Sequence, residues 1–143
     1  MSVLIDTGVL YADHDTAATR HDSARKALEA VYDGRYGQPL VSKYVFDELL
    51  TLTVSRTDSV EAATTVGDRI LGRGPYPSVF DLLDVSDAEF FEALEVFGRY
   101  SDQNLSFTDA TLVAQARRNE VDGVLSFDDD FDGIVDRIAP ETV

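Results

Sequence analysis

Short apolar segments alternate with longer amphipathic segments along the chain. The runs Val3–Ile5 and Val124–Ser126 are too short for helices and are typical of buried strands. Between such runs lie segments such as Asp15–Val31, in which apolar residues recur among charges with the spacing of a helix that packs on one side. Strands that alternate with helices favour a parallel sheet, because each helix returns the chain to the same end of the sheet. The sequence therefore predicts an α/β domain whose parallel sheet is covered by helices on both faces.

The same pattern places the individual elements. Strands are expected at residues 3–5, 39–42, 79–83 and 124–126, with a short edge strand within 134–138. Helices are expected at residues 15–31, 43–56, 58–71 and 108–119, with a further helix that starts after residue 86. Ser86 and Glu89 form a capping box before that helix, and Asp58 with Glu61 resembles one. No linker or internal repeat divides the 143 residues, so residues 1–143 are expected to form one domain.

Composition excludes several classes of protein. Hydrophobic residues make up 44% of the chain, which is too many for a disordered protein. No apolar run approaches the ~20 residues of a membrane-spanning helix, and the N-terminus lacks the basic start and apolar stretch of a signal peptide. The chain has no cysteine, which rules out disulfides and thiolate metal sites. We expect a cytoplasmic protein that does not enter a membrane.

The charge balance bears on the ligand. The formal net charge is −15, from 27 acidic and 12 basic residues, whereas nucleic-acid-binding proteins usually carry a basic patch. Only Lys26 and Lys43 are lysines, and an acid-rich, lysine-poor surface suits molar salt, where the Debye length shrinks to ~3 Å. We interpret the surface as that of a halophile, so the overall charge does not decide the ligand. Phosphates can still be bound by local arginines, namely Arg20, Arg56, Arg69, Arg73, Arg117 and Arg118.

Four acidic residues stand beside apolar segments, at predicted strand ends or on predicted helices: Asp6, Glu48, Asp109 and Asp128. Asp6 and Asp128 follow predicted strands, and ligands of open α/β sheets bind at the carboxyl ends of strands. Carboxylates gathered without cations repel one another and raise one another's pKa. Chains that gather them usually hold a divalent metal, and Mg²⁺ and Mn²⁺ prefer carboxylate oxygen and water. The sequence therefore indicates metal-assisted chemistry on a phosphate.

Three of these acids also have a simpler structural explanation. Asp6 fits a helix N-cap, because an Asp side chain accepts backbone N–H groups there. Asp109 fits the first turn of a helix capped by Thr108, where the helix dipole favours a negative charge. Glu48 fits a partly exposed position on a crowded apolar helix.

Asp128 opens an acidic run, residues 128–133, that is typical of a solvated loop. With acids at its first, third and fifth positions and Gly133 at its sixth, the run also matches half of a calcium-binding loop. The match fails at the twelfth position, where Ala139 stands in place of the bidentate Glu. The run also follows a strand rather than a helix, so a calcium site is the weaker interpretation.

The four segments together resemble the PIN-domain ribonucleases, and most closely the VapC-type toxins of toxin–antitoxin pairs. The resemblance covers essentially the whole chain. Each motif is short, but their order and spacing in a chain of this length are fairly specific. The resemblance rests on Leu4-Ile5-Asp6-Thr7, on Glu48, on Leu105-Ser106-Phe107-Thr108-Asp109-Ala110, and on Leu125-Ser126-Phe127-Asp128 with Asp130 and Phe131.

This resemblance implies a three-layer α/β/α sandwich with a mostly parallel central sheet. It implies that an acidic pocket holds one or two Mg²⁺ or Mn²⁺ ions, and that the protein hydrolyses RNA phosphodiester bonds with water activated by the metal. The implied catalytic and metal-binding residues are Asp6, Glu48, Asp109 and Asp128, with Asp130 as a further metal ligand.

Supporting roles follow from the same resemblance. Thr7 and Thr108 are expected to orient a water or a carboxylate, and Phe131 is expected in the core. The chain departs from the pattern at Gly8, where many relatives carry Asn or Ser. Its acidic surface also differs from the more basic rim of many relatives that cut RNA.

The resemblance further implies three partners: an RNA substrate, a small antitoxin that covers or enters the active site, and a second copy in a homodimer. The apolar helices at residues 43–71 could supply a surface for antitoxin or dimer, or could be ordinary core. The leading function is the endoribonuclease toxin of a type II toxin–antitoxin system. Two alternatives stay open, a PIN nuclease that processes RNA without a toxin role and a catalytically silent PIN-like domain that binds RNA or protein.

Two unrelated classes of protein share parts of the pattern. The run Asp6-Thr7-Gly8 after an apolar strand matches a retroviral-type aspartic protease, but such proteases are mostly β. A response-regulator receiver domain holds acids on a parallel sheet, but it needs paired acids after the first strand and a lysine near the last. Asp6 has no acidic neighbour, and both lysines lie in the first half of the chain.

Overall fold

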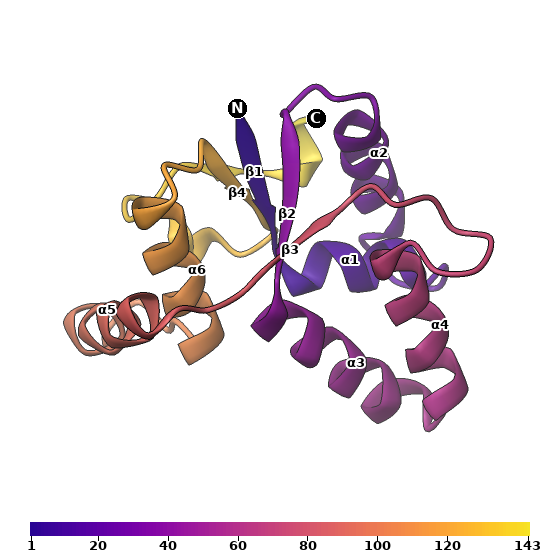
Figure 1. Ribbon diagram of the computed structural model, residues 1–143, viewed down its shortest axis with the longest axis horizontal. Helices are drawn as coiled ribbons and strands as arrows, with labels where there is room; N and C mark the ends of the chain where they lie inside the picture. The colour runs from indigo at the N-terminus through magenta and orange to yellow at the C-terminus, as the bar shows by residue number, and fades with distance from the viewer.

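The computed structural model describes residues 1–143 and contains a five-stranded sheet between two layers of helices (Figure 1). The strand order is β3-β2-β1-β4-β5, and every neighbouring pair is parallel. The expected α/β/α sandwich is therefore confirmed, with a sheet that is wholly parallel. The strands are β1 (Ser2–Ile5), β2 (Gln38–Ser42), β3 (Asp81–Leu83), β4 (Gly123–Leu125) and β5 (Arg137–Ile138).

Six α-helices connect the strands. The helices α1 to α4 contact one another on one side of the sheet, and α5 contacts α6 on the other side (Figure 1). None of these helices is long and apolar enough to cross a membrane. Their bounds are α1 (Thr7–His14), α2 (His21–Tyr32), α3 (Lys43–Thr57), α4 (Val60–Leu71), α5 (Asp87–Arg99) and α6 (Phe107–Arg118).

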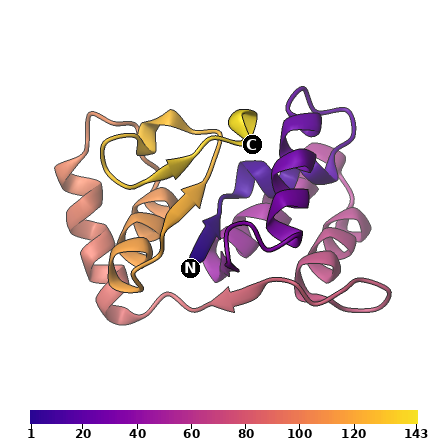
Figure 2. The same ribbon diagram turned by 90° about the horizontal axis from the view of Figure 1, so that it is seen from above.

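The path of the chain explains this division of helices. From β1, at the centre of the sheet, the chain moves outward to β2 and then to β3 at the edge. It then crosses back beyond β1 to form β4 and β5, and Figure 2 shows the segment around β3 running from one helix group to the other. Because crossovers in parallel sheets share one hand, a chain that reverses its direction along the sheet places its helices on the opposite face. The reversal lies between β1 and β4, where a crevice opens at the carboxyl ends of the strands.

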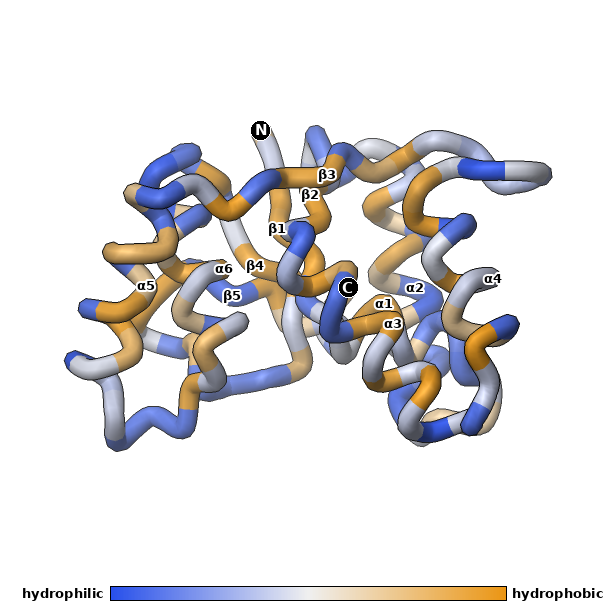
Figure 3. The backbone as a smooth tube through the Cα atoms, turned by 60° about the horizontal axis from the view of Figure 1, so that its bottom comes forward, coloured by the Kyte–Doolittle hydropathy of each residue, from blue (hydrophilic) through white to orange (hydrophobic).

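The central strands form the core. Val3–Ile5 and Val124–Leu125 are fully buried, and every residue of α6 from Asp109 to Ala116 is buried. Figure 3 shows hydrophobic residues concentrated along the central strands and hydrophilic residues in the connecting loops. Phe131 is also fully buried, as expected. This packing holds the paired ends of β1 and β4, which precede Asp6 and Asp128, beside each other.

Helix α1 is not expected from the sequence pattern. In α1 nearly every residue is buried, so the segment lacks the polar face by which an amphipathic helix is recognised. The helix expected at residues 15–31 begins only at His21, because residues 15–20 form the turn between α1 and α2. In that turn the Asp15 carboxylate accepts the backbone N–H of Ala17 at 3.0 Å.

The two expected capping boxes differ in outcome. The box of Ser86 and Glu89 at the start of α5 is confirmed. The one expected at Asp58 is wrong, because Asp58 ends α3 in a left-handed conformation with φ of 53°. Ser59 caps α4 instead, and its hydroxyl accepts the backbone N–H of Ala62 at 3.0 Å.

Candidate active site

A cavity of about 540 Å³ lies at the carboxyl ends of β1 and β4. All four acids singled out from the sequence, Asp6, Glu48, Asp109 and Asp128, line it. They come from four separate segments of the chain: the end of β1, helix α3, the first turn of α6 and the loop after β4. The remaining lining residues are Thr7, Gly8, Arg20, Ser106, Phe127 and Asp129.

Asp6 is fixed at the junction of β1 and α1. Its backbone N–H donates to the carbonyl of Leu125 at 3.0 Å, so β1 stays paired with β4 up to this residue. Its Oδ1 accepts the backbone N–H of Thr7 at 2.8 Å, which makes Asp6 the N-cap of α1. Its Oδ2 accepts the Ser126 hydroxyl at 2.6 Å. The Asp6 carboxylate therefore caps α1, as expected from the sequence, and also lines the cavity.

Asp109 is held by a reciprocal capping box at the start of α6. Its backbone N–H donates to the Ser106 hydroxyl at 3.0 Å, and its Oδ2 accepts the backbone N–H of Ser106 at 3.0 Å. Thr108 is therefore not the cap that the sequence suggested. Thr108 also does not line the cavity, whereas Thr7 does.

Glu48 reaches the cavity from α3. The helix begins at Lys43, directly after β2, and the Ser42 hydroxyl caps it by accepting the backbone N–H of Tyr44 at 3.2 Å. Glu48 is half-buried, while its neighbour Asp47 is exposed and lies outside the cavity. The two adjacent acids of α3 thus have different surroundings.

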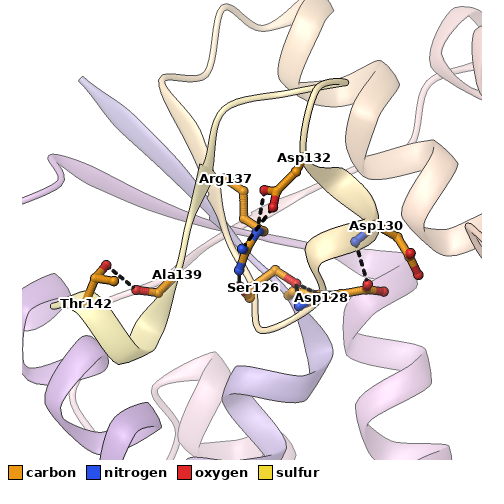
Figure 4. Close-up of polar contacts among 8 residues, drawn as sticks. Ser126, Asp128, Asp130, Asp132, Arg137, Ala139 and Thr142 are labelled. Carbon is orange, nitrogen blue, oxygen red and sulfur yellow. Dashed lines mark hydrogen bonds and ion pairs between the residues drawn. The ribbon is translucent and has the colours of Figure 1, made fainter. Parts of the chain in front are cut away.

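Asp128 is positioned by the short loop after β4. Its backbone N–H donates to the Ser126 hydroxyl at 2.9 Å, and its Oδ1 accepts the backbone N–H of Asp130 at 2.9 Å (Figure 4). Carboxylate oxygens of Asp128, Asp129 and Asp130 lie within 4.8 Å of one another. Asp129 lines the cavity, but Asp130 does not. The structure therefore places Asp130 beside the site rather than in its wall.

Arg137, on β5, stabilises the loop that carries Asp128. Arg137 donates to both carboxylate oxygens of Asp132, at 2.7 and 3.1 Å, and to the carbonyl of Ser126 at 3.1 Å (Figure 4). The ion pair holds the pKa of Asp132 below its usual value. Because the Ser126 hydroxyl contacts both Asp6 and Asp128, Arg137 supports the site through the backbone of Ser126.

Burial and crowding raise the pKa of two carboxyl groups of the cavity. The pKa of Asp6 is raised mainly by burial, and the charges of Glu48 and Asp128 add to this effect. Burial also raises the pKa of Asp109 to about 7, with further contributions from Asp6 and Asp128. Mutual repulsion of this kind is relieved when a cation binds among the carboxylates.

The donor set fits a hard divalent cation. Its oxygens are carboxylates, which Mg²⁺ and Mn²⁺ prefer. None of the four acids has an arginine or lysine nitrogen within 4.0 Å, so no side chain of the protein neutralises them. The hydroxyl oxygen of Thr7 is buried in the cavity wall without a hydrogen-bond partner. A hydrated metal ion would satisfy both the charges and this hydroxyl.

The sequence alone does not reveal the contacts of three site residues, namely Ser126, Arg20 and Phe127. Ser126 is recognisable only from its contacts with Asp6 and Asp128. Arg20 is the one basic residue of the cavity wall, and its guanidinium carbon lies 4.8 Å from the centre of the Phe127 ring. The sequence named Arg20 among six arginines but could not pair it with Phe127, because the two come from opposite ends of the chain.

Comparison with known proteins identifies relatives along most of the chain. The sequence profile of the PIN domain matches residues 3–136. A VapC ribonuclease of Archaeoglobus fulgidus is 30% identical over 112 residues, which make up 77% of this chain and 67% of the relative. Ribonuclease VapC26 of Mycobacterium tuberculosis is 28% identical over 126 residues, covering 88% of this chain and 86% of the relative.

Solved structures share the fold. VapC20 of Mycobacterium tuberculosis, a toxin that cleaves the sarcin–ricin loop, superimposes with a TM-score of 0.74 at 23% identity, covering 90% of this chain and 92% of that one. A chain of a toxin–antitoxin complex from Klebsiella pneumoniae gives a TM-score of 0.66 at 19% identity, covering 96% and 97% of the two chains. At these identities the likeness concerns the arrangement of strands and helices.

Proposed function

The chain belongs to the PIN-domain family, and on that premise we propose that it is a divalent-metal-dependent endoribonuclease, the toxin of a type II toxin–antitoxin pair. One observation carries the proposal. Four carboxylates from four separate chain segments line one cavity, and the protein supplies no ion pair to neutralise them. A fold does not by itself determine an activity, and this site supplies the chemistry that the relatives' names suggest.

We assign the metal to Asp6, Glu48, Asp109 and Asp128. Asp130 serves as an outer ligand or as a partner of Asp128, because its carboxylate lies beside the cavity rather than in its wall. A bound Mg²⁺ or Mn²⁺ ion supplies Lewis-acid activation of water and offsets negative charge on the phosphate.

The protein's own contribution is to hold the ligands in place before RNA arrives. Ser126 and the backbone of Thr7 each bind one oxygen of Asp6, and the Ser106 backbone binds one oxygen of Asp109. The backbone N–H of Ser106 binds Oδ2 of Asp109 and leaves Oδ1 without a backbone donor. Ligands fixed in this way need little reorganisation during the reaction.

We place the antitoxin in the groove between α3 and α4. This groove of about 520 Å³ is lined mainly by Leu50, Val54, Val60 and Ala63. An antitoxin segment in this groove would run along α3, the helix that carries Glu48 to the acidic cavity. The net charge of −15 favours a basic partner, whose arginine could reach the carboxylates.

We place the second copy of a homodimer on α5. Phe91, Leu94 and Phe97 share one side of this helix and are 63%, 47% and 46% exposed. They adjoin a partly buried cluster in which the Phe90 and Phe97 rings pack edge-on against Phe107, with ring centres 5.5 and 5.9 Å apart. A contiguous exposed apolar patch of this kind is typical of a protein–protein interface.

The test is cleavage of RNA by the purified protein in high-salt buffer. We expect cleavage with Mn²⁺ or Mg²⁺, none with EDTA, and none by an Asp6→Asn variant that binds RNA normally. Cleavage that persists in EDTA or in the variant would contradict the assignment. If the protein binds metal and RNA but cleaves neither pure nor cellular RNA, it is a silent PIN-like domain. Growth arrest on expression, relieved by a neighbouring antitoxin gene, separates a toxin from an RNA-processing nuclease.

A further inference from the structure

A second cavity adjoins the acidic one. It measures about 470 Å³, and Gly8, Arg20 and Phe127 line both cavities. From this shared wall it extends along α1 and α3 to Tyr11 and Arg56. The two cavities therefore form one continuous groove that leads away from the four carboxylates.

The chemistry of the groove changes along its length. The acidic cavity is followed by two arginines that each lie over an aromatic ring. Arg20 lies 4.8 Å from the centre of the Phe127 ring, and Arg56 lies 5.2 Å from the centre of the Tyr11 ring. A guanidinium held over an aromatic ring in this way is restricted in position, while its N–H groups stay available to a ligand.

Neither arginine is neutralised by the protein. No carboxylate oxygen lies within 4.0 Å of Arg20 or Arg56, although the chain has 27 acidic and 12 basic residues. The second cavity contains one acid, Asp15, which is already bound by the backbone N–H of Ala17 at 3.0 Å and the Tyr11 hydroxyl at 3.3 Å. Two arginines without an ion pair, each placed over an aromatic ring, therefore line one groove and leave their N–H groups open to an anion.

We infer that this groove is the track for single-stranded RNA on one side of the cleavage site. The inference rests on the proposed function and extends it to the path of the substrate. The scissile phosphate lies at the acidic cavity, the next phosphate is bound by Arg20, and the following nucleotide meets Arg56. Guanidinium groups bind phosphate oxygens bidentately, and their planes stack on unpaired bases.

The aromatic rings decide how this contact is made. Tyr11 is only 6% exposed, so its ring packs against Arg56 and offers little surface to a base. Phe127 is half-buried at the boundary of the two cavities, where it supports Arg20 beside the carboxylates. Both arginines thus face the ligand, and bases stack on guanidinium planes rather than on the rings. Unpaired bases are needed for this mode, which is why the inferred substrate is single-stranded.

Gly8 keeps the groove continuous. A Cβ atom added to this residue would meet no atom within 4 Å, and Gly8 is exposed in the first turn of α1. A larger side chain is therefore compatible with the fold, but it would occupy the space that the two cavities share. The lack of a side chain at Gly8 thus widens the exit from the acidic cavity.

The first test measures RNA binding without cleavage. A fluorescently labelled single-stranded RNA is titrated with the 143-residue protein carrying Asp6→Asn, and anisotropy reports the affinity. We expect Arg20→Gln with Arg56→Gln to weaken binding by about tenfold or more. The matched control is Arg35→Gln with Arg99→Gln, two exposed arginines outside the groove that change the net charge equally. An equal loss in both pairs, or no loss in either, overturns the inference.

The second test uses Gly8. We expect Gly8→Leu to raise the KM for RNA cleavage about fivefold or more with a smaller effect on kcat, and the control Gly98→Leu, at an exposed helical glycine outside both cavities, to leave the KM unchanged. Unchanged KM in Gly8→Leu contradicts the track. A duplex that binds as tightly as the single strand, and loses as much affinity in the groove variants, overturns the single-stranded assignment.

The two proposals fail separately. Without any cleavage by the wild-type protein, the ribonuclease proposal fails, whereas the anisotropy comparison still tests the groove. With metal-dependent cleavage but unchanged affinity and KM in the groove variants, the ribonuclease proposal stands and the inferred track is wrong.

Discussion

The Ser126 hydroxyl donates a 2.6 Å hydrogen bond to the Asp6 carboxylate, joining the end of β4 to the end of β1. The same oxygen accepts the backbone N–H of Asp128 at 2.9 Å. Ser126 is fully buried, so water cannot replace either bond. One hydroxyl therefore holds the carboxylate of Asp6 and the backbone of Asp128, two site residues that come from opposite ends of the chain.

Replacing Ser126 by Ala should loosen both contacts. We expect Mn²⁺ affinity and cleavage to fall about 10- to 100-fold, as when other outer partners of metal ligands are removed. Stability should fall by on the order of 1–3 kcal/mol, because a buried carboxylate loses its donor. Isothermal titration with Mn²⁺ and urea unfolding measure the two effects. Ser101→Ala, at an exposed position, is the control, and unchanged Mn²⁺ affinity in Ser126→Ala would show that Asp6 does not depend on this bond.

The raised pKa of Asp109 predicts a pH dependence of stability. Its value is about 7 in the folded protein and about 3.8 in an unfolded chain, so between these values the folded protein binds more protons. Without divalent metal, stability therefore falls as the pH rises from about 4 to about 7 and then levels off.

Asp109→Asn should remove this contribution. In EDTA we expect the variant to be more stable than wild type at pH 8, by on the order of 1–3 kcal/mol, and the difference to vanish near pH 4. Urea unfolding at the two pH values measures this, with exposed Asp102→Asn as the control. Equal stability of Asp109→Asn and wild type at pH 8 would mean that the carboxyl is not destabilised by the fold.

Asp128 and Asp130, both in the acidic loop after β4, should differ in their importance for cleavage. Asp128 lines the cavity, whereas Asp130 contributes its backbone N–H to hold Asp128. We expect Asp128→Asn to slow cleavage at least about 100-fold and Asp130→Asn to slow it less than about tenfold, because the backbone contact survives. Initial rates at saturating Mn²⁺ provide the measurement. A loss in Asp130→Asn as large as that in Asp128→Asn would make Asp130 a direct metal ligand.

The apolar side of α5 should be where two copies meet. We expect Phe91→Glu with Phe97→Glu to convert a dimer into a monomer, because two charges would be buried at the interface. Light scattering after gel filtration gives the mass, and circular dichroism checks the fold. Val60→Glu, a substitution at a 71% exposed apolar residue on α4, is the control. A dimer that survives the α5 substitutions and dissociates with Val60→Glu would move the interface to α3 and α4.

Much of the fold is readable from local sequence. Helix α5 is marked by its capping box, and the buried β1 and β4 are marked by short apolar runs, because these signals depend on neighbours in the chain. Helix α1 is hidden, since a helix buried on nearly every side has no polar face. The turn at residues 15–20 is hidden as well, because its alanines and charges also fit a helix.

The candidate site divides in the same way. Carboxylates at strand ends and on a helix next to a strand can be picked out one by one, and the topology of a parallel sheet brings them together. Contacts between distant segments leave no local pattern in the sequence. The hydrogen bond from Ser126 to Asp6 and the contact of Arg20 with the Phe127 ring are therefore visible only in the structure. Ser106 rather than Thr108 caps α6 because Ser106 is the last residue with an extended backbone before the helix begins. Two hydroxyl residues so close in the sequence do not show at which of them the helix begins.

The central claim is that the cavity carboxylates, rather than the acidity of the protein, support cleavage of RNA. Glu48 and Asp47 test it, because they are adjacent on α3 and only Glu48 lines the cavity. We would measure cleavage rates of Glu48→Gln and Asp47→Asn in Mn²⁺, since each variant loses one negative charge. The account predicts at least about a 100-fold loss for Glu48→Gln and less than about a twofold change for Asp47→Asn. Equal rates in the two variants would contradict it.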